Sequence, residues 1–220
     1  LKNIKAHIKI SPLETLVASP EKVLTIDQHT YSYVYLEKFR LLQPLVNMQL
    51  NCDVAVEVGS GCGFMAHLIC EHVQPNTLFL IDHLGPNIYA YDYLNKIKSL
   101  DYSLHIQTED QLQFQPNSKQ IILLTPRQID LLTGLRPTLV INCTSLCLME
   151  QYERKQYIDL MNKEWAQTTL LLGHAGPWDD PLRKISLEQL AASINRPSLE
   201  SAKLMNLTGE NEGGSEYFIF

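Results

Sequence analysis

Three glycines that alternate directly after an acidic residue form the stretch of this sequence best suited to specific chemistry. They are Gly59, Gly61 and Gly63, and Glu57 lies two residues before the first of them. A short β-branched, apolar run leads into them, and an apolar segment that suits a helix follows. A strand that ends at alternating glycines and turns into a helix leaves backbone N–H groups uncovered beside a ligand. The pattern predicts an adenine-containing cofactor lying across the carboxyl end of a parallel sheet.

The spacing of the glycines distinguishes two kinds of cofactor. A dinucleotide site has the order G-x-G-x-x-G, and counting from Gly59 places Phe64 at the last glycine, so this register fails. Counting from Gly61 places Ala66 there, which the relaxed form allows, but Gly59 and Ser60 are then inserted between strand and fingerprint. The observed order, apolar-Glu-apolar-Gly-x-Gly-x-Gly, resembles instead the first motif of class I S-adenosylmethionine (SAM)-dependent methyltransferases.

That resemblance implies SAM as the cofactor and gives roles to the residues of the turn. Glu57 is expected near the methionine end of the cofactor. The residues expected to pass beneath it are Gly59, Ser60, Gly61 and Gly63. An ordinary tight turn between a strand and a helix, with no ligand, is the alternative interpretation.

Composition narrows the class of protein. The 220 residues suit one domain, or one domain with a small appendage, and 45% hydrophobic residues supply a full core. A net charge of −6 and the lack of a Lys/Arg run argue against nucleic acid as the main partner. No apolar run reaches the length of a membrane span, and residues 1–10 carry lysines throughout, so no signal peptide is visible.

Five cysteines without a C-x-x-C pair fit reduced, buried thiols, so we expect a cytoplasmic protein. The chain begins with Leu1 rather than Met, which leaves open that residues precede it.

We expect residues 1–50 to form an N-terminal helical cap and residues 51–220 to form the methyltransferase domain. Apolar residues recur at three- and four-residue steps between Asp27 and about Val46. The members of this helical stripe are Tyr31, Tyr35, Phe39 and Leu42, with Glu37, Lys38 and Arg40 off the stripe. Pro44 predicts a kink or break late in the helix. Aromatic stripes at this spacing usually pack in a core, but Tyr31 and Tyr35 are also candidates to line a substrate mouth.

An acid ends the second predicted strand, residues 77–82. This residue, Asp82, lies about 20 residues past the glycines, where such folds place a carboxylate on the ribose hydroxyls. A carboxylate accepts two hydrogen bonds from a vicinal diol. The alternative is a cap for the next helix, predicted from about residue 86 to 97.

Two segments compete for the third strand. Residues 119–124 are the more apolar, and we take them as the third parallel strand, so that Thr125 and the loop to Gln128 flank the adenine. If residues 102–107 are that strand instead, Glu109 and Asp110 take this place.

The remaining pattern predicts a Rossmann-like, three-layer α/β sandwich with a mostly parallel, seven-stranded sheet. Further strands are expected at 138–142 and 168–173, and helices at 151–164 and after an N-cap at Ser186. The last two strands, 203–207 and 216–220, are joined by a Gly-rich hairpin. An antiparallel last strand is what class I methyltransferases show.

A narrower resemblance covers about half of the chain, from residue 54 to residue 157. It is carried by Leu80-Ile81-Asp82, Ala90-Tyr91-Asp92-Tyr93-Leu94, Leu123-Leu124-Thr125-Pro126, and Ile141-Asn142-Cys143-Thr144-Ser145-Leu146 with Met149. These segments resemble the sugar O-methyltransferases of bacterial surface-polysaccharide and glycoside pathways. The resemblance implies methyl transfer to a hydroxyl of a sugar or another small molecule. Where that family has Glu before Met, this chain has Leu148, with its acid at Glu150.

Such a transfer needs an oxygen held in line with the S–CH3 bond and a general base. His174 directly follows the fifth predicted strand and is the candidate base, with a structural histidine as the alternative. Asn142 is a candidate cofactor ligand or a strand-end cap, and Ser145 a candidate substrate ligand. Asp179 and Asp180 are expected to form a solvated loop rather than a metal site.

Two other classes stay open. One is an NAD-dependent oxidoreductase or epimerase that uses the register from Gly61. The other is a module that binds SAM without transferring its methyl group. The sequence leaves the small-molecule acceptor and the oligomeric state undefined.

Overall fold

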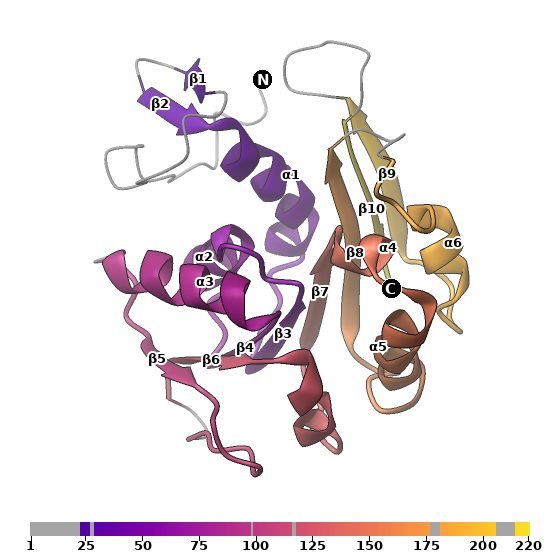
Figure 1. Cartoon of the computed structure of the whole chain (residues 1–220). Helices are drawn as coiled ribbons and strands as arrows, with labels where there is room; N and C mark the ends of the chain where they lie inside the picture. Colours follow the sequence, from indigo (N-terminus) through magenta and orange to yellow (C-terminus); the bar gives the residue numbers. More distant parts are fainter. Residues whose placement is uncertain (1–22, 27–28, 98, 116–117, 177–180, 206–213) are drawn as a thin grey trace.

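The structure is a computed structural model that describes residues 23–26, 29–97, 99–115, 118–176, 181–205 and 214–220 (Figure 1). The predictions for residues 1–22, for Asp179 and Asp180, and for the Gly-rich loop 206–213 lie outside these residues.

An eight-stranded sheet forms the centre of the molecule, with the strand order β5-β6-β4-β3-β7-β8-β10-β9. The strands are β3 (Val54–Val58), β4 (Thr77–Ile81), β5 (Ser103–Ile106), β6 (Gln120–Leu124), β7 (Leu139–Cys143), β8 (Thr169–Gly176), β9 (Glu200–Met205) and β10 (Gly214–Ile219). The pairs from β5 to β8 are parallel, and β10 is antiparallel to both of its neighbours. The strand order reverses at β3, where ligands bind in open α/β sheets.

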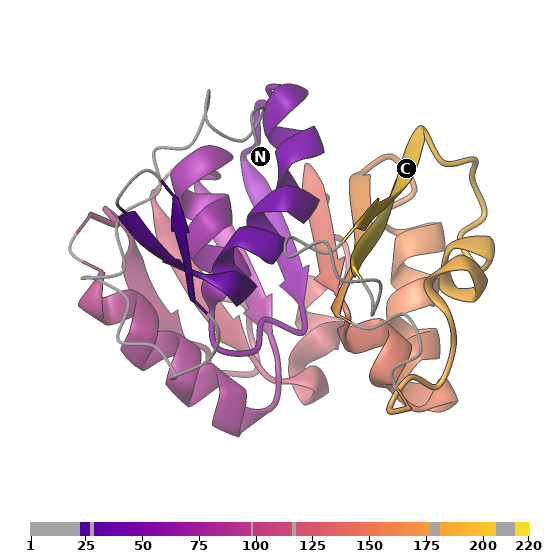
Figure 2. The ribbon, with the colours of Figure 1, turned by 90° about the horizontal axis from the view of Figure 1, so that it is seen from above.

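Helices cover both faces of this sheet, as Figures 1 and 2 show. They are α1 (Tyr33–Asn47), α2 (Phe64–His72), α3 (Leu84–Lys96), α4 (Ser145–Leu148), α5 (Gln151–Lys163), α6 (Leu187–Ala192) and the 3-10 helix η3 (Pro126–Leu132). Apolar side chains of α1, α2 and α3 share one core cluster with one face of the sheet. Those of η3, α4, α5 and α6 share a second cluster with the other face. Strands buried on both sides explain the continuous apolar runs of the sequence.

The predicted fold class is confirmed, with one strand more than expected. Both segments that competed for the third strand are strands. The buried β6 pairs with β4, and the largely exposed β5 adds an edge beside β6. The competition arose because an edge strand buries less apolar surface and so carries a weaker pattern.

The N-terminal segment differs from its prediction. Residues 29–32 form strand β2 (His29–Ser32), which pairs with β1 (Val23–Ile26) in an antiparallel hairpin, so the helix begins at Tyr33 rather than Asp27. It continues through Pro44 to Asn47, so the predicted break is not found. Three- and four-residue spacing alone does not locate a helix start, because local hydrogen bonds and tertiary contacts decide it.

The predicted N-cap of α6 is confirmed, whereas the prediction of a buried thiol is wrong for Cys62. Ser186 caps α6, and its side chain accepts a hydrogen bond from the Gln189 N–H. All five cysteines are free thiols; four are buried, but Cys62 is exposed.

Helix α1 packs on α2, β8 and β10, and one contact fixes its place on the sheet. A Cβ atom added to Gly173 of β8 would lie 3.3 Å from Leu41 Cδ1, so helix and strand approach closely there. One turn earlier, the Ser215 hydroxyl of β10 donates a hydrogen bond to the buried Glu37 carboxylate. Ser215 pairs with Ala175 near the carboxyl end of β8. The first half of α1 therefore lies at the carboxyl edge of the sheet.

Gly173→Val is expected to lower the free energy of unfolding by about 1–3 kcal/mol, because its methyl groups overlap Leu41. Urea denaturation of Gly173→Val, Leu41→Ala and the double variant measures the coupling. The double variant should cost less than the sum of the two single changes. Leu45→Ala, one turn further along the same helix, should combine additively. Additive costs for the Leu41 pair would contradict this docking of α1.

Candidate functional site

The glycine turn begins directly where β3 ends. Strand β3 stops at Val58, and Gly59, Gly61 and Gly63 have φ angles of 76°, 54° and 85°. L-residues with a side chain rarely adopt such angles. The Gly59 N–H donates to the Ile81 carbonyl at 2.8 Å, which joins the turn to β4. A Cβ atom at Gly59 would lie 1.9 Å from Ser145 Oγ, so only glycine fits there.

Asp82 lies beside this turn at the carboxyl end of β4. One of its carboxylate oxygens accepts a hydrogen bond from the Gly61 N–H at 2.8 Å, and the other accepts from the His83 N–H at 2.7 Å. Each oxygen of a carboxylate has a further lone pair. The side chain thus holds the turn in place and can still accept hydrogen bonds from a ligand.

A pocket of about 250 Å³ opens next to Asp82. Its lining residues are Gly59, Ile81, Asp82, His83, Pro126, Ser145, Leu148, Met149, Glu153 and Tyr157. They come from the end of β4 and from the segments that follow β3, β4, β6 and β7, so the pocket lies at the point where the strand order reverses. Thr125 does not line it; its N–H and hydroxyl both donate to the Gln128 side chain at the start of η3. The neighbouring Pro126 occupies the predicted place.

Glu57 has no exposed surface and points to the face of the sheet that α1 and α2 cover, because it alternates with Val56 and Val58. Neither of its carboxylate oxygens has a hydrogen-bond partner among the described residues. Burial raises the pKa of Glu57 to about 8; the positive charge of Lys38 opposes this rise, and the negative charge of Asp82 adds to it. The Ser60 hydroxyl is also buried without a partner among these residues.

Buried polar groups are nearly always hydrogen-bonded, since leaving one unpaired costs about 1–3 kcal/mol, and more for a charge. The unpaired oxygens of Glu57, near the end of β3, and of Ser60, inside the glycine turn, are therefore candidates to bind a ligand. Both residues belong to the glycine motif, so the sequence alone predicted them as candidates.

Asn142 and Ser145 lie at the same turn, and their side chains form hydrogen bonds within the protein. The Asn142 amide donates to the Val58 carbonyl at 2.7 Å and to Ser145 Oγ. The Ser145 hydroxyl also donates to the Val58 carbonyl, at 3.0 Å. These bonds tie the end of β3 to the start of α4. Ser145 lines the pocket, whereas Asn142 is fully buried behind it, as its alternative role of strand-end cap predicts.

His174 and Tyr35 lie away from the pocket lining. His174 is fully buried, on the face of the sheet that carries Leu172 and α6, and it pairs across the ladder with Glu216. Tyr35 is buried between helices, and its hydroxyl donates to Glu71 at 3.0 Å. Tyr31 belongs to β2, but its side chain lies outside the described set.

Lys38 is a charged neighbour of this site that the sequence pattern did not single out. It was expected on the polar side of α1, as was Glu37, which is buried. Helical spacing cannot find such residues, because α1 packs on both α2 and the sheet and so buries more than one stripe.

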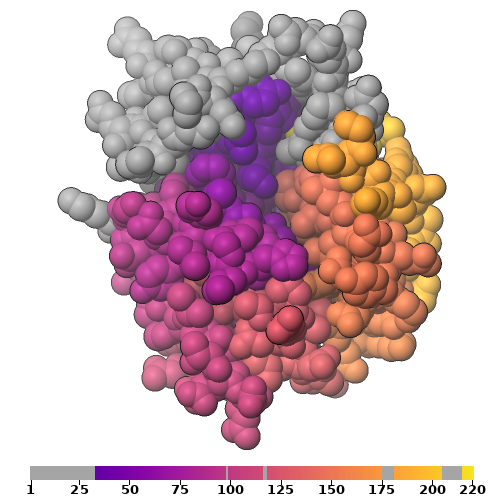
Figure 3. Space-filling model, in the orientation of Figure 1, coloured from indigo at the N-terminus to yellow at the C-terminus, as the bar shows by residue number. Residues whose placement is uncertain are grey.

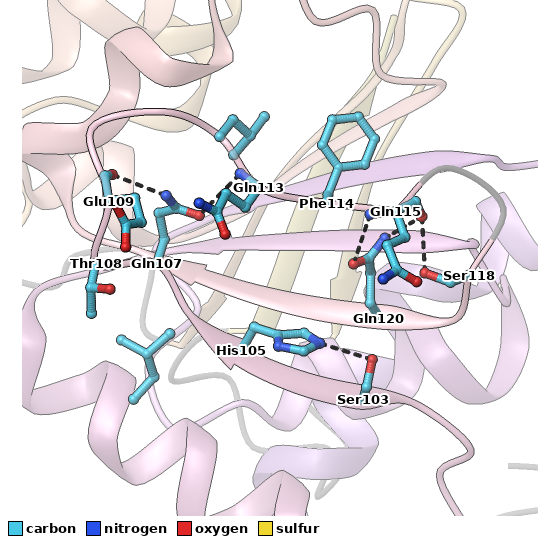
Figure 4. A pocket seen from close by; sticks show the side chains of 12 residues that line it. Ser103, His105, Gln107, Thr108, Glu109, Gln113, Phe114, Gln115, Ser118 and Gln120 are labelled. Atoms are coloured by element: carbon cyan, nitrogen blue, oxygen red, sulfur yellow. Dashed lines mark hydrogen bonds between the residues drawn. The ribbon is translucent and has the colours of Figure 1, made fainter.

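A second, larger pocket of about 680 Å³ lies between β5 and the segment that leads from it to β6 (Figure 4). Glutamine side chains dominate it, and their amides hold this segment together. Gln107 donates to the carbonyls of Glu109 and Gln111, and Gln120 donates to Thr77 and to the Gln115 carbonyl. We therefore interpret the glutamines as structural residues that hold the segment between β5 and β6 in place.

Within the described part of the chain, no group of three or more His, Cys, Asp or Glu side chains is placed to hold a metal ion. In the same residues, no helix has the length and apolar character needed to cross a membrane.

No family model and no curated protein matches the sequence, but solved structures match the fold. One is the small RNA methyltransferase HEN1, at 12% identity and a TM-score of 0.58, over 92% of this chain and 26% of that chain. Another is magnesium protoporphyrin IX methyltransferase from Synechocystis PCC 6803 with bound SAM. It matches at 11% identity and a TM-score of 0.54, over 85% of this chain and 78% of that chain. A third is the glycopeptide N-methyltransferase MtfA, which matches at 8% identity and a TM-score of 0.58, over 83% of this chain and 89% of that chain.

The chain therefore has the fold of the class I SAM-dependent methyltransferases. At these identities the likeness establishes the architecture alone.

Gly59→Ala is expected to lower the free energy of unfolding by about 3–5 kcal/mol. The added Cβ overlaps Ser145, and the alanine must adopt a positive φ. Gly61→Ala is the matched control. Its φ is also positive, but no atom of the described residues lies within 4 Å of the added Cβ, so a loss of about 1–2 kcal/mol is expected. Urea denaturation measures both. Equal costs would show that the contact with Ser145 does not constrain the turn.

The raised pKa of Glu57 predicts a pH dependence of stability in the ligand-free protein. The folded state keeps this proton up to about pH 8, whereas an unfolded glutamate releases it near pH 4.5. Unfolding between these values releases a proton, so stability falls as pH rises through this window and levels off above it. Glu57→Gln removes the effect.

Urea titrations from pH 5 to pH 9 should therefore show Glu57→Gln gaining on the wild type with rising pH, by at most about 1.4 kcal/mol per pH unit. The gain should level off above pH 8. A difference between the two proteins that stays constant across the window would contradict the raised pKa.

Proposed function

We propose that this protein is a SAM-dependent methyltransferase that transfers the methyl group to a hydroxyl of a small molecule, with a sugar as the favoured acceptor. The observation that carries the proposal is the buried, unpartnered Glu57 carboxylate beside a turn of positive-φ glycines, with Asp82 at the end of the next strand.

The groups present suit SAM. The amino-acid end of SAM carries an ammonium group, and its sulfur is a positively charged sulfonium; both favour a buried carboxylate such as Glu57 nearby. Asp82 has lone pairs left for the ribose hydroxyls. The apolar side chains around the 250 Å³ pocket, such as Ile81 and Leu148, suit a flat purine ring.

The geometry also favours SAM over NAD. Strand β3 ends at Val58, directly before Gly59, so the dinucleotide register from Gly61 would place two extra residues between strand and fingerprint. The antiparallel β10, inserted between β8 and β9, fits the methyltransferase sheet.

When bound, SAM supplies an activated methyl group, whose C–S bond breaks as the C–O bond to the acceptor forms. The protein positions the groups: Gly59 and Gly61 let the ligand approach the backbone, Asp82 orients the ribose, and Glu57 balances positive charge. The acceptor hydroxyl must lose its proton to a base. His174 remains the proposed base, and it is fully buried outside the pocket lining.

The oxygen acceptor is supported by the sequence resemblance from residue 54 to residue 157 and by a net charge of −6, which disfavours nucleic acid. The solved methyltransferases of this fold act on chemically different acceptors, so the fold leaves this choice open.

Calorimetric titration with SAM, S-adenosylhomocysteine (SAH) and NAD tests the cofactor. We expect SAM and SAH to bind and NAD not to bind. Asp82→Asn should weaken SAH binding by about 10- to 100-fold, because one charged acceptor is lost. Asp92→Asn, an exposed carboxylate of α3, should leave binding unchanged. Binding of NAD alone would refute the proposal.

Transfer of radiolabelled methyl to a panel of sugars and other small hydroxyl compounds tests the acceptor. Label in a sugar is expected. SAM binding without transfer to any acceptor would favour a SAM-binding module instead.

A further inference from the structure

An ammonium group and a carboxyl group lie near each other on the α1 side of the sheet. The carboxyl group is that of the buried Glu57, near the end of β3. Its pKa of about 8 keeps it protonated at neutral pH in the ligand-free protein, and a cationic group bound beside it favours its ionised form. The ammonium group is that of the partly buried Lys38 in α1. Figure 3 shows α1, in indigo, recessed between α3 in magenta and the orange segments that begin at α4.

The docking of α1 places Lys38 at the carboxyl edge of the sheet. Lys38 precedes Leu41 by three residues, so both share one side of the helix. Leu41 packs on Gly173, and Gly173 pairs in the ladder with Cys143 at the end of β7. Strand β7 is the direct neighbour of β3, so Lys38 lies above the ends of both strands.

The chemical surroundings of Lys38 keep it charged. Burial opposes the charged form, but the Cys143 thiol and the Glu57 carboxylate favour it more, and the pKa of Lys38 is raised above its ordinary value. Its ammonium group is thus present at neutral pH. Among the described residues, however, no ion pair within 4.0 Å joins Lys38 to Glu57, and both Glu57 oxygens stay without a hydrogen-bond partner.

An ammonium group and a carboxyl group that lie near each other without forming an ion pair match a ligand that is itself a zwitterion, because the ligand's ammonium group stabilises the ionised form of Glu57. An α-amino acid carries an ammonium and a carboxylate on one carbon atom, so it can satisfy both groups at once. A ligand with the ammonium alone would satisfy Glu57 and leave Lys38 uncompensated.

We propose that Lys38 and Glu57 together bind the amino-acid end of the cofactor, with Glu57 receiving its ammonium group and Lys38 its carboxylate. This inference rests on the proposed function, because SAM and SAH both carry this amino-acid group. It makes Lys38 a cofactor-binding residue supplied from outside the glycine motif, and α1 a part of the site. The protein then selects cofactors with an intact carboxylate over otherwise identical ones without it.

The test compares SAH with decarboxylated SAH by calorimetric titration of the full chain. The wild type should bind SAH about 10- to 100-fold more tightly, since a charge-assisted interaction is lost with the carboxylate. Lys38→Met should reduce SAH affinity by a similar factor and leave the affinity for decarboxylated SAH unchanged. Lys38→Arg should keep part of the preference. Lys96→Met, which removes an exposed lysine of α3, is the matched control and should change neither affinity.

Each outcome separates this inference from the proposed function. If the wild type binds neither ligand, the proposed function fails. If the wild type binds both ligands equally, the carboxylate is not recognised and the role of Lys38 is refuted, whatever the variants do. If Lys38→Met weakens the binding of both ligands alike, or of neither, Lys38 does not recognise the carboxylate. Thermal denaturation confirms that each variant is folded, and Lys38→Gln replaces Lys38→Met if that variant is not.

Discussion

A carboxylate buried in the central strand without a hydrogen-bond partner is the constraint on which the rest of the site depends. Glu57 is costly for the ligand-free fold, because its charged form is out of contact with water and its oxygens have no partner among the described residues. The fold reduces this cost in two ways: the pKa of Glu57 rises to about 8, and Lys38 supplies an opposite charge nearby. A ligand that brings an ammonium group relieves it further. Stability given up at this point becomes affinity for the ligand.

The other buried charges of the molecule show the contrast. Glu216 forms an ion pair with Arg183 at 2.6 Å, and Glu37 is paired with Arg40 at 3.0 Å. The Arg183 pair joins the segment before α6 to β10, and the Glu37 carboxylate, paired with Arg40 inside α1, also accepts a hydrogen bond from Ser215 of β10. We therefore interpret both pairs as structural. Strain gathers instead at the carboxyl edge of the sheet: Thr144 has a φ of 84°, which costs a β-branched residue on the order of 1–3 kcal/mol. Its N–H donates to the Gly173 carbonyl at 2.7 Å, which holds the strained turn beside the site.

The cofactor and acceptor halves of such a site are built from different kinds of segment. The glycine turn, Asp82 and the pocket next to it lie on the ends of buried parallel strands, where backbone geometry leaves few alternatives. We propose that acceptor recognition falls to α1 and to the loops after β7 and β8. Loops and terminal helices vary with little penalty to the core, so one fold can serve many acceptors.

The sequence by itself determined the sheet and the cofactor motif. Strands buried on both faces leave continuous apolar runs, and a turn with positive φ angles favours glycine at Gly59, Gly61 and Gly63, so both features are local. The structure alone decided what depends on distant contacts. It turned residues 29–32 into a strand, buried His174 opposite Glu216, engaged Asn142 and Ser145 with the Val58 carbonyl, and brought Lys38 to Glu57. A charge pair between a helix and a strand leaves no periodic trace in the sequence, because its spacing is set by packing rather than by the chain.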